Sequence, residues 1–161
     1  MENNDDAITT RIQSAKNWLE SLAKGQESSE IETKPLQNLY SIRVRRNLIH
    51  CNFIVPQSLS DGDGRWHVGA ISTLIDVIGA TVAYTSFGKH YVSVDFNISY
   101  FSTASFKYVR EETEVEDKVL GHKGNLSSVM VVIKKKDNGD LVASLGKQWM
   151  AEFSNHPKSK I

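Results

Sequence analysis

The chain has 161 residues, which suits one domain built around one hydrophobic core. It carries 19 basic and 19 acidic residues, so its charge gives no reason to expect nucleic-acid binding. The single cysteine, Cys51, excludes an internal disulfide and a thiolate metal cluster, and the five histidines are not spaced as metal ligands. The first residues are acidic and polar, unlike a targeting peptide, and predict an intracellular protein.

The N-terminal region predicts an amphipathic helix followed by a linker. Apolar residues recur at three- and four-residue intervals over residues 7–24, and Gly25 is a typical helix stop. Residues 26–34 are polar and lead to Pro35, so we expect a loop there. We therefore assign residues 1–34 to an N-terminal helix and linker. Residues 35–154 form the main domain and residues 155–161 a flexible tail.

Two strands are expected at residues 39–44 and 48–55, ahead of a long apolar segment. From His67 to Phe87 that segment has one formal charge, Asp76, and apolar residues fall on every face. This pattern predicts a helix over about residues 67–86 that is buried all round. The segment is long enough for a membrane span, but its central aspartate favours the core helix of a soluble protein.

The rest of the chain predicts further strands joined by tight turns. The expected strands cover residues 91–101, 112–120, 127–135 and 141–153, with hairpin turns at 121–125 and 137–140. We expect an α+β fold in which an antiparallel meander, with two strands before the helix, curls around that helix.

Three features of this region suggest chemistry. The backbone N–H groups of His67, Val68 and Gly69 at the helix start favour negative charge, as an oxyanion hole requires. Asp76 can orient or deprotonate a water, because a buried carboxylate is costly unless it is paired or kept for chemistry. Ser93 can hold that water. Alternatively, His67 is only a helix cap and Ser93 only faces solvent.

The spacing of these residues favours a site shared by two chains. Gly69 and Asp76 are seven residues apart, about 10.5 Å along a helix axis. A donor and a base that act on one carbonyl group fit better at a shorter separation. Two such helices packed antiparallel would bring the start of one against the aspartate of the other. We therefore expect a homodimer with two sites at its interface.

Two motifs carry a resemblance to a known family. They are Trp66-His67-Val68-Gly69-Ala70 with Thr73-Leu74-Ile75-Asp76, and Val92-Ser93-Val94-Asp95-Phe96-Asn97-Ile98-Ser99-Tyr100. From about Leu39 to Phe153 the chain resembles the hotdog-fold acyl-coenzyme A thioesterases. It is most similar to a plant member of the acyl-coenzyme A thioesterase 13-like (thioesterase superfamily member 2) and phenylacetate-degradation branch.

The resemblance implies a hotdog fold, in which an antiparallel sheet wraps a central helix, and dimers that pair into a homotetramer. It also implies hydrolysis of medium- to long-chain fatty acyl-CoA without metal or cofactor. Within that family pattern, Asp76 matches the general base and Ser93 the water-positioning serine. Val68 supplies the backbone N–H that polarises the thioester carbonyl, while His67 organises the loop beside Gly69.

The coenzyme A segments of the family correspond to residues 100–105 and 121–126. The implied contacts there are Tyr100, Ser102, Thr103, Ser105, His122, Lys123 and Asn125. The chain departs from the family at Val68, where glycine is common, and at Asp61, which aligns with an asparagine. Gln148 stands where some members have a histidine, so the roles of Asp61 and Gln148 are open. The chain is about three residues longer than the family pattern around residues 106–110.

Other functions remain open at this point. A hotdog hydratase would need a histidine near Asp76 on the same helix, and after Asp76 none occurs before His90. A non-catalytic acyl-CoA binder or scaffold is the alternative from another class, and the presence of both Asp76 and Ser93 argues against it. The final residues, Ser159-Lys160-Ile161, resemble the peroxisomal Ser-Lys-Leu signal, or else form a frayed polar tail. We expect a peroxisomal or cytoplasmic protein.

Overall fold

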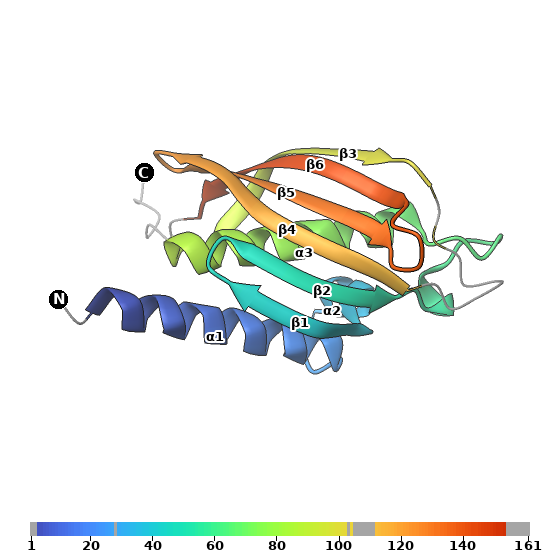
Figure 1. Ribbon diagram of the computed structural model, residues 1–161, viewed down its shortest axis with the longest axis horizontal. Helices are drawn as coiled ribbons and strands as arrows, with labels where there is room; N and C mark the ends of the chain where they lie inside the picture. The colour runs from blue at the N-terminus through green and yellow to red at the C-terminus, as the bar shows by residue number, and fades with distance from the viewer. Residues whose placement is uncertain (1–2, 28, 103, 105–111, 154–161) are drawn as a thin grey trace, which may run out of the picture.

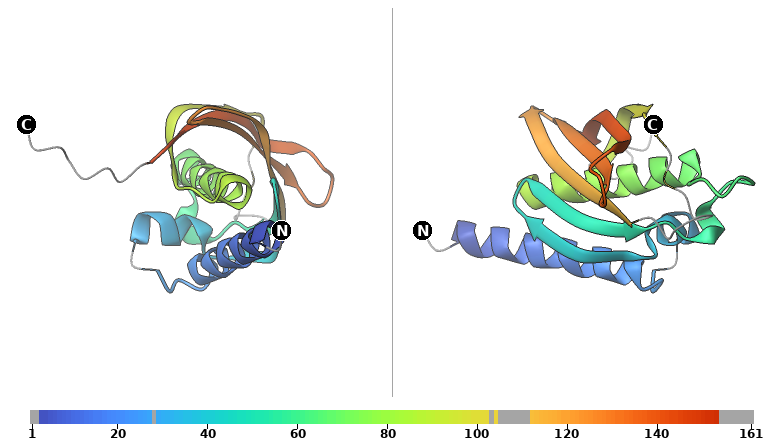
Figure 2. Two further views of the ribbon diagram at one scale, coloured as in Figure 1. Left: turned by 90° about the vertical axis from the view of Figure 1, so that its left-hand side faces the viewer. Right: turned by 45° about the vertical axis from the view of Figure 1, so that its right-hand side comes forward.

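The computed structural model describes residues 3–27, 29–102, 104 and 112–153. A six-stranded antiparallel sheet curls around one long helix, as Figures 1 and 2 show, and two further helices lie beside it. In chain order the elements are α1 (Asn3–Ala23), α2 (Glu30–Leu36), β1 (Leu39–Arg45), β2 (Leu48–Ile54), the 3-10 helix η1 (Gln57–Leu59), α3 (Val68–Phe87), β3 (Tyr91–Tyr100), β4 (Glu112–Lys123), β5 (Leu126–Lys135) and β6 (Leu141–Glu152).

The central helix α3 begins and ends at residues that cap it. His67 precedes the helix in an extended conformation, and its side chain accepts a hydrogen bond from the Gly69 N–H. Gly88 ends the helix with a φ of +68°, a left-handed conformation that favours glycine, and its N–H donates to the Tyr84 carbonyl at 2.8 Å. The observed helix agrees with the predicted range of residues 67–86 to within one residue.

The prediction that α3 is buried all round is wrong for this chain. The sheet covers one side of the helix, and α1 and α2 cover another, whereas one stripe is left open. The open stripe runs at four-residue spacing through Val68, Ser72, Asp76, Ala80 and Tyr84, of which Val68 and Asp76 are exposed and the others half-buried. By length and composition α3 could cross a membrane, but 56% of its most apolar stretch is buried inside the protein. It is a core helix.

The order of the strands in the sheet is β1-β2-β4-β5-β6-β3. The predicted meander is therefore correct for β4, β5 and β6 but wrong for β3, which pairs with β6 at the edge of the sheet. After β3 the chain crosses the fold, and β4 pairs with β2 instead. This pairing gives β2 a hydrogen-bonded neighbour on each side and closes the curl around α3 (Figure 1).

The turn between β4 and β5 is shorter than predicted. β4 continues to Lys123, which pairs with Leu126, so only Gly124 and Asn125 form the turn. Gly124 has a φ of +61°, which glycine adopts without strain. The predicted turn at residues 137–140 is confirmed: the Lys135 N–H donates to the Asp140 carbonyl across it.

The predicted loop at residues 26–34 is wrong from Glu30 onward, because α2 begins at that residue. Ser29 precedes this helix, and Glu30 and Glu32 lie in its first turn, where negative charge is favourable. Pro35, to which the expected loop leads, lies in the last turn of the helix and is buried with Leu36. Together α1 and α2 pack on α3, so the N-terminal segment belongs to the same layered unit.

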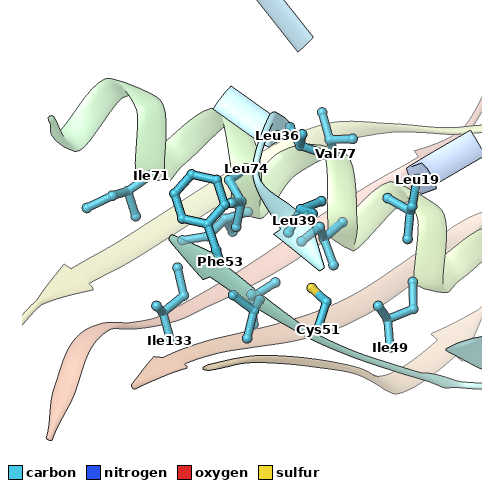
Figure 3. Close-up of a cluster of buried hydrophobic side chains, with 14 of the residues drawn as sticks. Leu19, Leu36, Leu39, Ile49, Cys51, Phe53, Ile71, Leu74, Val77 and Ile133 are labelled. Carbon is cyan, nitrogen blue, oxygen red and sulfur yellow. The ribbon is translucent and has the colours of Figure 1, made fainter. Parts of the chain in front are cut away.

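The core lies between α3, the concave face of the sheet and the two N-terminal helices. Figure 3 shows Leu19 and Leu36 from the N-terminal helices facing Cys51 and Phe53 of β2. Phe53 also stacks on Trp66, with ring centroids 4.8 Å apart. Cys51 is fully buried, and burial raises the pKa of its thiol to about 12, so it is an inert core residue.

Candidate active site

Asp76 on α3 is held by two side chains from neighbouring strands. Ser93, on β3, donates its hydroxyl to Asp76 Oδ1, and Gln148, on β6, donates its amide Nε2 to the same oxygen at 2.6 Å. The Gln148 amide also donates to Ser93 Oγ at 2.5 Å. The three residues form a closed hydrogen-bonded triangle. Both bonds that described residues give to Asp76 end at Oδ1, so Oδ2 is the oxygen open to a water.

The triangle fixes the orientation of each group in it. An ionised carboxylate only accepts hydrogen bonds, so the Gln148 NH₂ and not its carbonyl faces Asp76. The Gln148 side chain is fully buried and passes beneath α3 at Gly79. A Cβ on Gly79 would lie 2.3 Å from Gln148 Oε1, so only glycine at that position leaves room for the amide.

The environment of Asp76 differs from the sequence-based expectation in one respect. We expected a buried carboxylate that is either paired or kept for chemistry, whereas Asp76 is exposed, with Ser93 and Gln148 holding it. Its exposure follows from its place on the open stripe of α3, where no described element covers position 76. A water or a substrate can therefore reach Asp76 directly.

The start of α3 is arranged by His67. Its ring Nδ1 accepts from the Gly69 N–H at 3.0 Å, so His67 is the cap of the helix and Gly69 is engaged locally. The Val68 N–H is the first of the helix and has no acceptor inside it, as at any helix start. Tyr100 lies against this end, with its hydroxyl 2.8 Å from Ser72 Oγ and 3.4 Å from the Val68 carbonyl oxygen.

The residues expected to contact coenzyme A lie at opposite ends of α3. Tyr100 contacts the N-terminal end, whereas His122 stacks on Phe87 at the C-terminal end, with ring centroids 4.1 Å apart. Ser72 and Phe87 are separated by about 22 Å along the helix axis. Lys123 and Asn125 belong to the same hairpin as His122 and are exposed. The structure does not bring the two segments together within one chain.

Two other expected residues, Ser102 and Asp61, have different surroundings. Ser102 donates its hydroxyl to the Leu141 carbonyl at 2.5 Å. Asp61 accepts from the backbone N–H groups of Asp63 and Arg65, each at 2.9 Å, and pairs with the Arg65 guanidinium. These bonds, that from the Arg65 N–H first, lower the pKa of the Asp61 carboxyl. Asp61 therefore organises the loop ahead of α3.

Several expectations fall outside the described residues: Thr103, Ser105, the longer segment at 106–110, and the tail that contains Ser159-Lys160-Ile161. Within the described part of the chain, no group of three histidine, cysteine, aspartate or glutamate side chains could hold a metal ion.

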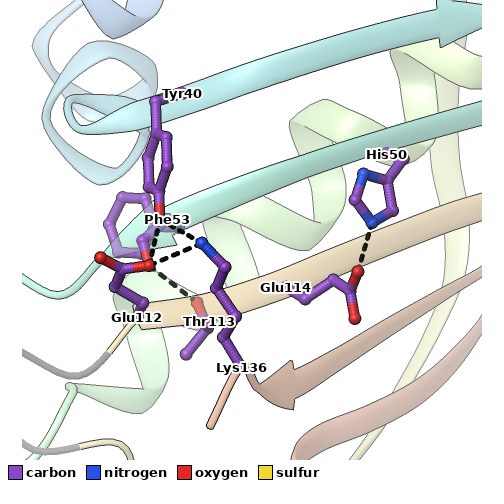
Figure 4. A network of polar contacts seen from close by, with 7 residues as sticks. All are labelled: Tyr40, His50, Phe53, Glu112, Thr113, Glu114 and Lys136. Carbon is purple, nitrogen blue, oxygen red and sulfur yellow. Dashed lines mark hydrogen bonds and ion pairs between the residues drawn. The ribbon is translucent and has the colours of Figure 1, made fainter. Parts of the chain in front are cut away.

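A second polar network lies on the outer face of the sheet, away from α3 (Figure 4). Glu112 accepts from the Tyr40 hydroxyl at 2.5 Å and from Lys136 Nζ at 2.8 Å, and His50 pairs with Glu114 at 2.6 Å. The bonds from Lys136 and then Tyr40 lower the pKa of the Glu112 carboxyl. These pairs link β1, β2, β4 and the residue after β5, and they are structural contacts.

Sequence reasoning identified Asp76, Ser93 and the helix start, but left Gln148 open and missed Gly79. A glycine in the middle of an apolar helix was the available signal, because it marks a close approach by another element. The element that approaches is β6, whose position is set by the non-local order of the sheet.

Solved structures share this architecture. Zebrafish thioesterase superfamily member 2 has a TM-score of 0.76 at 23% identity, over 89% of this chain and 98% of that chain. The Escherichia coli PaaI protein from the phenylacetic acid degradation operon has a TM-score of 0.67 at 14% identity, over 89% and 97%. A hypothetical thioesterase from Streptococcus pneumoniae, solved with coenzyme A, has a TM-score of 0.64 at 18% identity, over 71% and 85%.

These similarities show that the chain has the hotdog fold. No protein-family model and no curated protein sequence matches it.

Proposed function

We propose that this protein is an acyl-CoA thioesterase. The observation that supports the proposal best is the exposed Asp76 carboxylate, held at one oxygen by Ser93 and Gln148 and open at the other. A carboxylate fixed in this way can take a proton from a water that the Ser93 hydroxyl helps to position. The hotdog fold, which the chain shares with named thioesterases, agrees with this chemistry.

The reaction requires one water and no group beyond the side chains and the backbone. Asp76 accepts a proton from the water, whose oxygen attacks the carbonyl carbon of the thioester. The resulting oxyanion accepts a hydrogen bond from the Val68 N–H at a helix start, where the helix dipole adds to the stabilisation. The C–S bond then breaks, and the departing thiolate takes the proton from Asp76. The products are a free acid and coenzyme A.

The oxyanion donor in this mechanism comes from a second chain. Within one chain, Val68 and Asp76 lie eight residues apart on the open stripe, about 12 Å along the axis. Two α3 helices packed antiparallel through their open stripes would place Val68 of one chain near Asp76 of the other.

The edge strand β3 supports the formation of such a pair. Among the described strands, β3 pairs on one side only, so its other edge presents N–H and C=O groups for pairing. Its apolar side chains are exposed, with 46% of Val92, 57% of Val94 and 36% of Phe96 open to solvent. Natural proteins seldom leave an apolar edge strand uncovered, so a second copy of the chain is its expected partner. We propose a homodimer, and pairing of dimers into a tetramer as in the implied family.

The test is release of free thiol from acyl-CoA, followed with a thiol reagent. Wild-type protein should release coenzyme A, and Asp76→Asn should lower kcat by about 10²- to 10⁴-fold, since the amide is nearly isosteric but accepts no proton. Asp95→Asn, on the exposed surface of the same strand as Ser93, is the matched control. A protein that binds acyl-CoA without releasing thiol would be a binder, and near-normal turnover by Asp76→Asn would remove that residue from the mechanism.

A further inference from the structure

A cavity of about 380 Å³ lies between α1 and the C-terminal half of α3. Its walls include Ala15 and Trp18 from α1, Glu32 from α2, Ala80 and Tyr84 from α3, and Tyr91 at the start of β3. The cavity therefore exists because the N-terminal helices cover the flank of α3 without filling the space beside its small residues.

The cavity lies along the same helix and strand that carry Asp76 and Ser93. Ala80 and Tyr84 follow Asp76 by one and two helical turns on the open stripe, about 6 and 12 Å along the axis. On the neighbouring strand, Tyr91 precedes Ser93 by two residues, so both side chains lie on one face of β3. The two elements that carry Asp76 and Ser93 continue directly into the walls of the cavity.

The walls favour an apolar and uncharged occupant. Trp18, Tyr84 and Tyr91 supply aromatic surface, and the alanines leave the space between them. Among the described residues, Glu32 is the one carboxylate that lines the cavity, His90 also lines it, and no lysine or arginine does. A group that carried its own carboxylate would therefore meet the like charge of Glu32 without a lysine or arginine to pair with.

We propose that this cavity holds the acyl group of the thioester that Asp76 attacks, an inference that rests on the proposed function. The substrate class is uncharged acyl groups of up to about ten carbons, because the far wall at Tyr84 lies about 12 Å from Asp76 and single C–C bonds are about 1.5 Å long and staggered. Tyr84 sets the depth of the cavity, the small side chain of Ala80 keeps the path to that wall open, and Glu32 excludes acyl groups that end in a carboxylate.

The first experiment compares kcat/KM for acetyl-, hexanoyl-, decanoyl- and palmitoyl-CoA. In the wild type, kcat/KM should rise several-fold per added pair of carbons as far as decanoyl-CoA and then level off. Ala80→Leu should lower kcat/KM for decanoyl-CoA at least tenfold and leave acetyl-CoA within twofold. Ala7→Leu, near the far end of α1, is the matched control. Equal loss with all four substrates, or no loss with any, would overturn the inference.

A second variant, Tyr84→Ala, should shift the preference in kcat/KM toward longer acyl chains, which a general loss of stability would not do. Tyr84→Ala removes the far wall, so kcat/KM for palmitoyl-CoA should rise at least threefold relative to decanoyl-CoA. The exclusion of carboxylate-ended acyl groups by Glu32 is tested with adipoyl-CoA, whose six-carbon acyl group ends in a carboxylate. Glu32→Gln should raise the ratio of adipoyl-CoA to hexanoyl-CoA turnover at least fivefold, whereas Glu20→Gln should not. Unchanged ratios in both variants would contradict the assignment.

Measurements of acyl-CoA binding to an inactive variant test the acyl site independently of the proposed reaction. Asp76→Asn protein should bind decanoyl-CoA at least tenfold more tightly than acetyl-CoA in calorimetry, and adding Ala80→Leu should abolish the difference. If the wild type releases no thiol but this length-dependent binding is present, the reaction is wrong and the acyl site stands. If thiol is released and the two ligands bind Asp76→Asn equally, the reaction stands and the acyl site is wrong.

Discussion

At the scale of single residues, the hydrogen bonds around Asp76 depend on a residue with no side chain. Gly79 lets the buried Gln148 amide pass beneath α3 and reach both Asp76 and Ser93. The amide holds one carboxylate oxygen and so determines which oxygen faces the substrate. A methyl group at position 79 is the smallest change that tests this arrangement.

We predict that Gly79→Ala lowers kcat about tenfold or more. The added methyl would lie 2.3 Å from Gln148 Oε1, so the amide must move and its bond to the carboxylate is lost. A hydrogen bond to a charged group contributes about 1.5–3 kcal/mol. The double variant Gly79→Ala/Gln148→Ala should match Gln148→Ala alone in steady-state kinetics, because both changes remove the same contact. Additive losses would show that Gly79 acts in another way.

Asp117 is a second single residue that leads to a prediction, here about how the stability of the fold depends on pH. It is fully buried on β4, and neither carboxylate oxygen has a well-formed hydrogen bond to a described residue. Burial raises the pKa of the Asp117 carboxyl well above its ordinary value, against a smaller opposing effect of the Lys118 backbone. The folded protein therefore binds this proton more tightly than the unfolded chain does.

The raised pKa determines whether stability rises or falls with pH. The contribution of Asp117 to stability is complete below its unfolded pKa, about 3.9, and is lost as the pH rises toward its folded pKa, by up to about 1.36 kcal/mol per pH unit. We predict that Asp117→Asn, which mimics the neutral form, gains stability relative to wild type between pH 4.5 and 8. Urea unfolding at several pH values measures the difference. Glu116→Gln, at an exposed neighbour, should show none, and a flat difference for Asp117→Asn would refute the prediction.

At the scale of elements, local patterns in the sequence predicted the positions of α3 and all six strands to within a few residues. They did so because apolar periodicity and turn residues are local signals. Three features were not predicted, and each depends on contacts between distant segments. β3 pairs with β6, which follows some 50 residues later. α2 forms because Leu36 and Pro35 are buried against other elements, and the open stripe of α3 reflects what the rest of the chain leaves uncovered.

The candidate site was predictable to a similar extent. Asp76, Ser93 and the start of α3 lie within 27 residues of one another, and their residue types and spacing indicated their chemistry. Gln148 could not be assigned, because its contact with Asp76 depends on the register of β6 against β3. The placement of Tyr100 and His122 at opposite ends of α3 likewise followed only from the fold.

The exposed edge of β3 leads to a prediction about assembly. We expect Val94→Lys to shift the protein from dimer to monomer in size-exclusion chromatography with light scattering. Val94 is 57% exposed in the single chain, so a lysine there should leave each chain folded but would bring two like charges together across a paired edge. Val94→Thr, which keeps the shape, should remain dimeric. A monomeric wild type, or a lysine variant that stays dimeric, would exclude this edge as the interface.

At the scale of the whole molecule, a site shared by two chains can be tested by mixing two inactive variants. Asp76→Asn removes the base, and Val68→Pro removes the proposed oxyanion donor with little other change. Proline is favoured at the first position of a helix, and His67 before it already has the extended conformation that proline requires, with a φ of −67° and a ψ of 130°. Each homodimer should therefore fold and yet be inactive.

In a heterodimer of these variants, one of the two sites combines an intact Asp76 from one chain with an intact Val68 N–H from the other. Random exchange of equal amounts produces heterodimers as half of the dimers, so the mixture should recover about a quarter of wild-type activity, as two-fold symmetry requires. Each variant carries a different affinity tag, so that tandem purification confirms the exchange before the thiol-release assay. Purified heterodimers that remain as inactive as either parent would place the base and the donor within one chain.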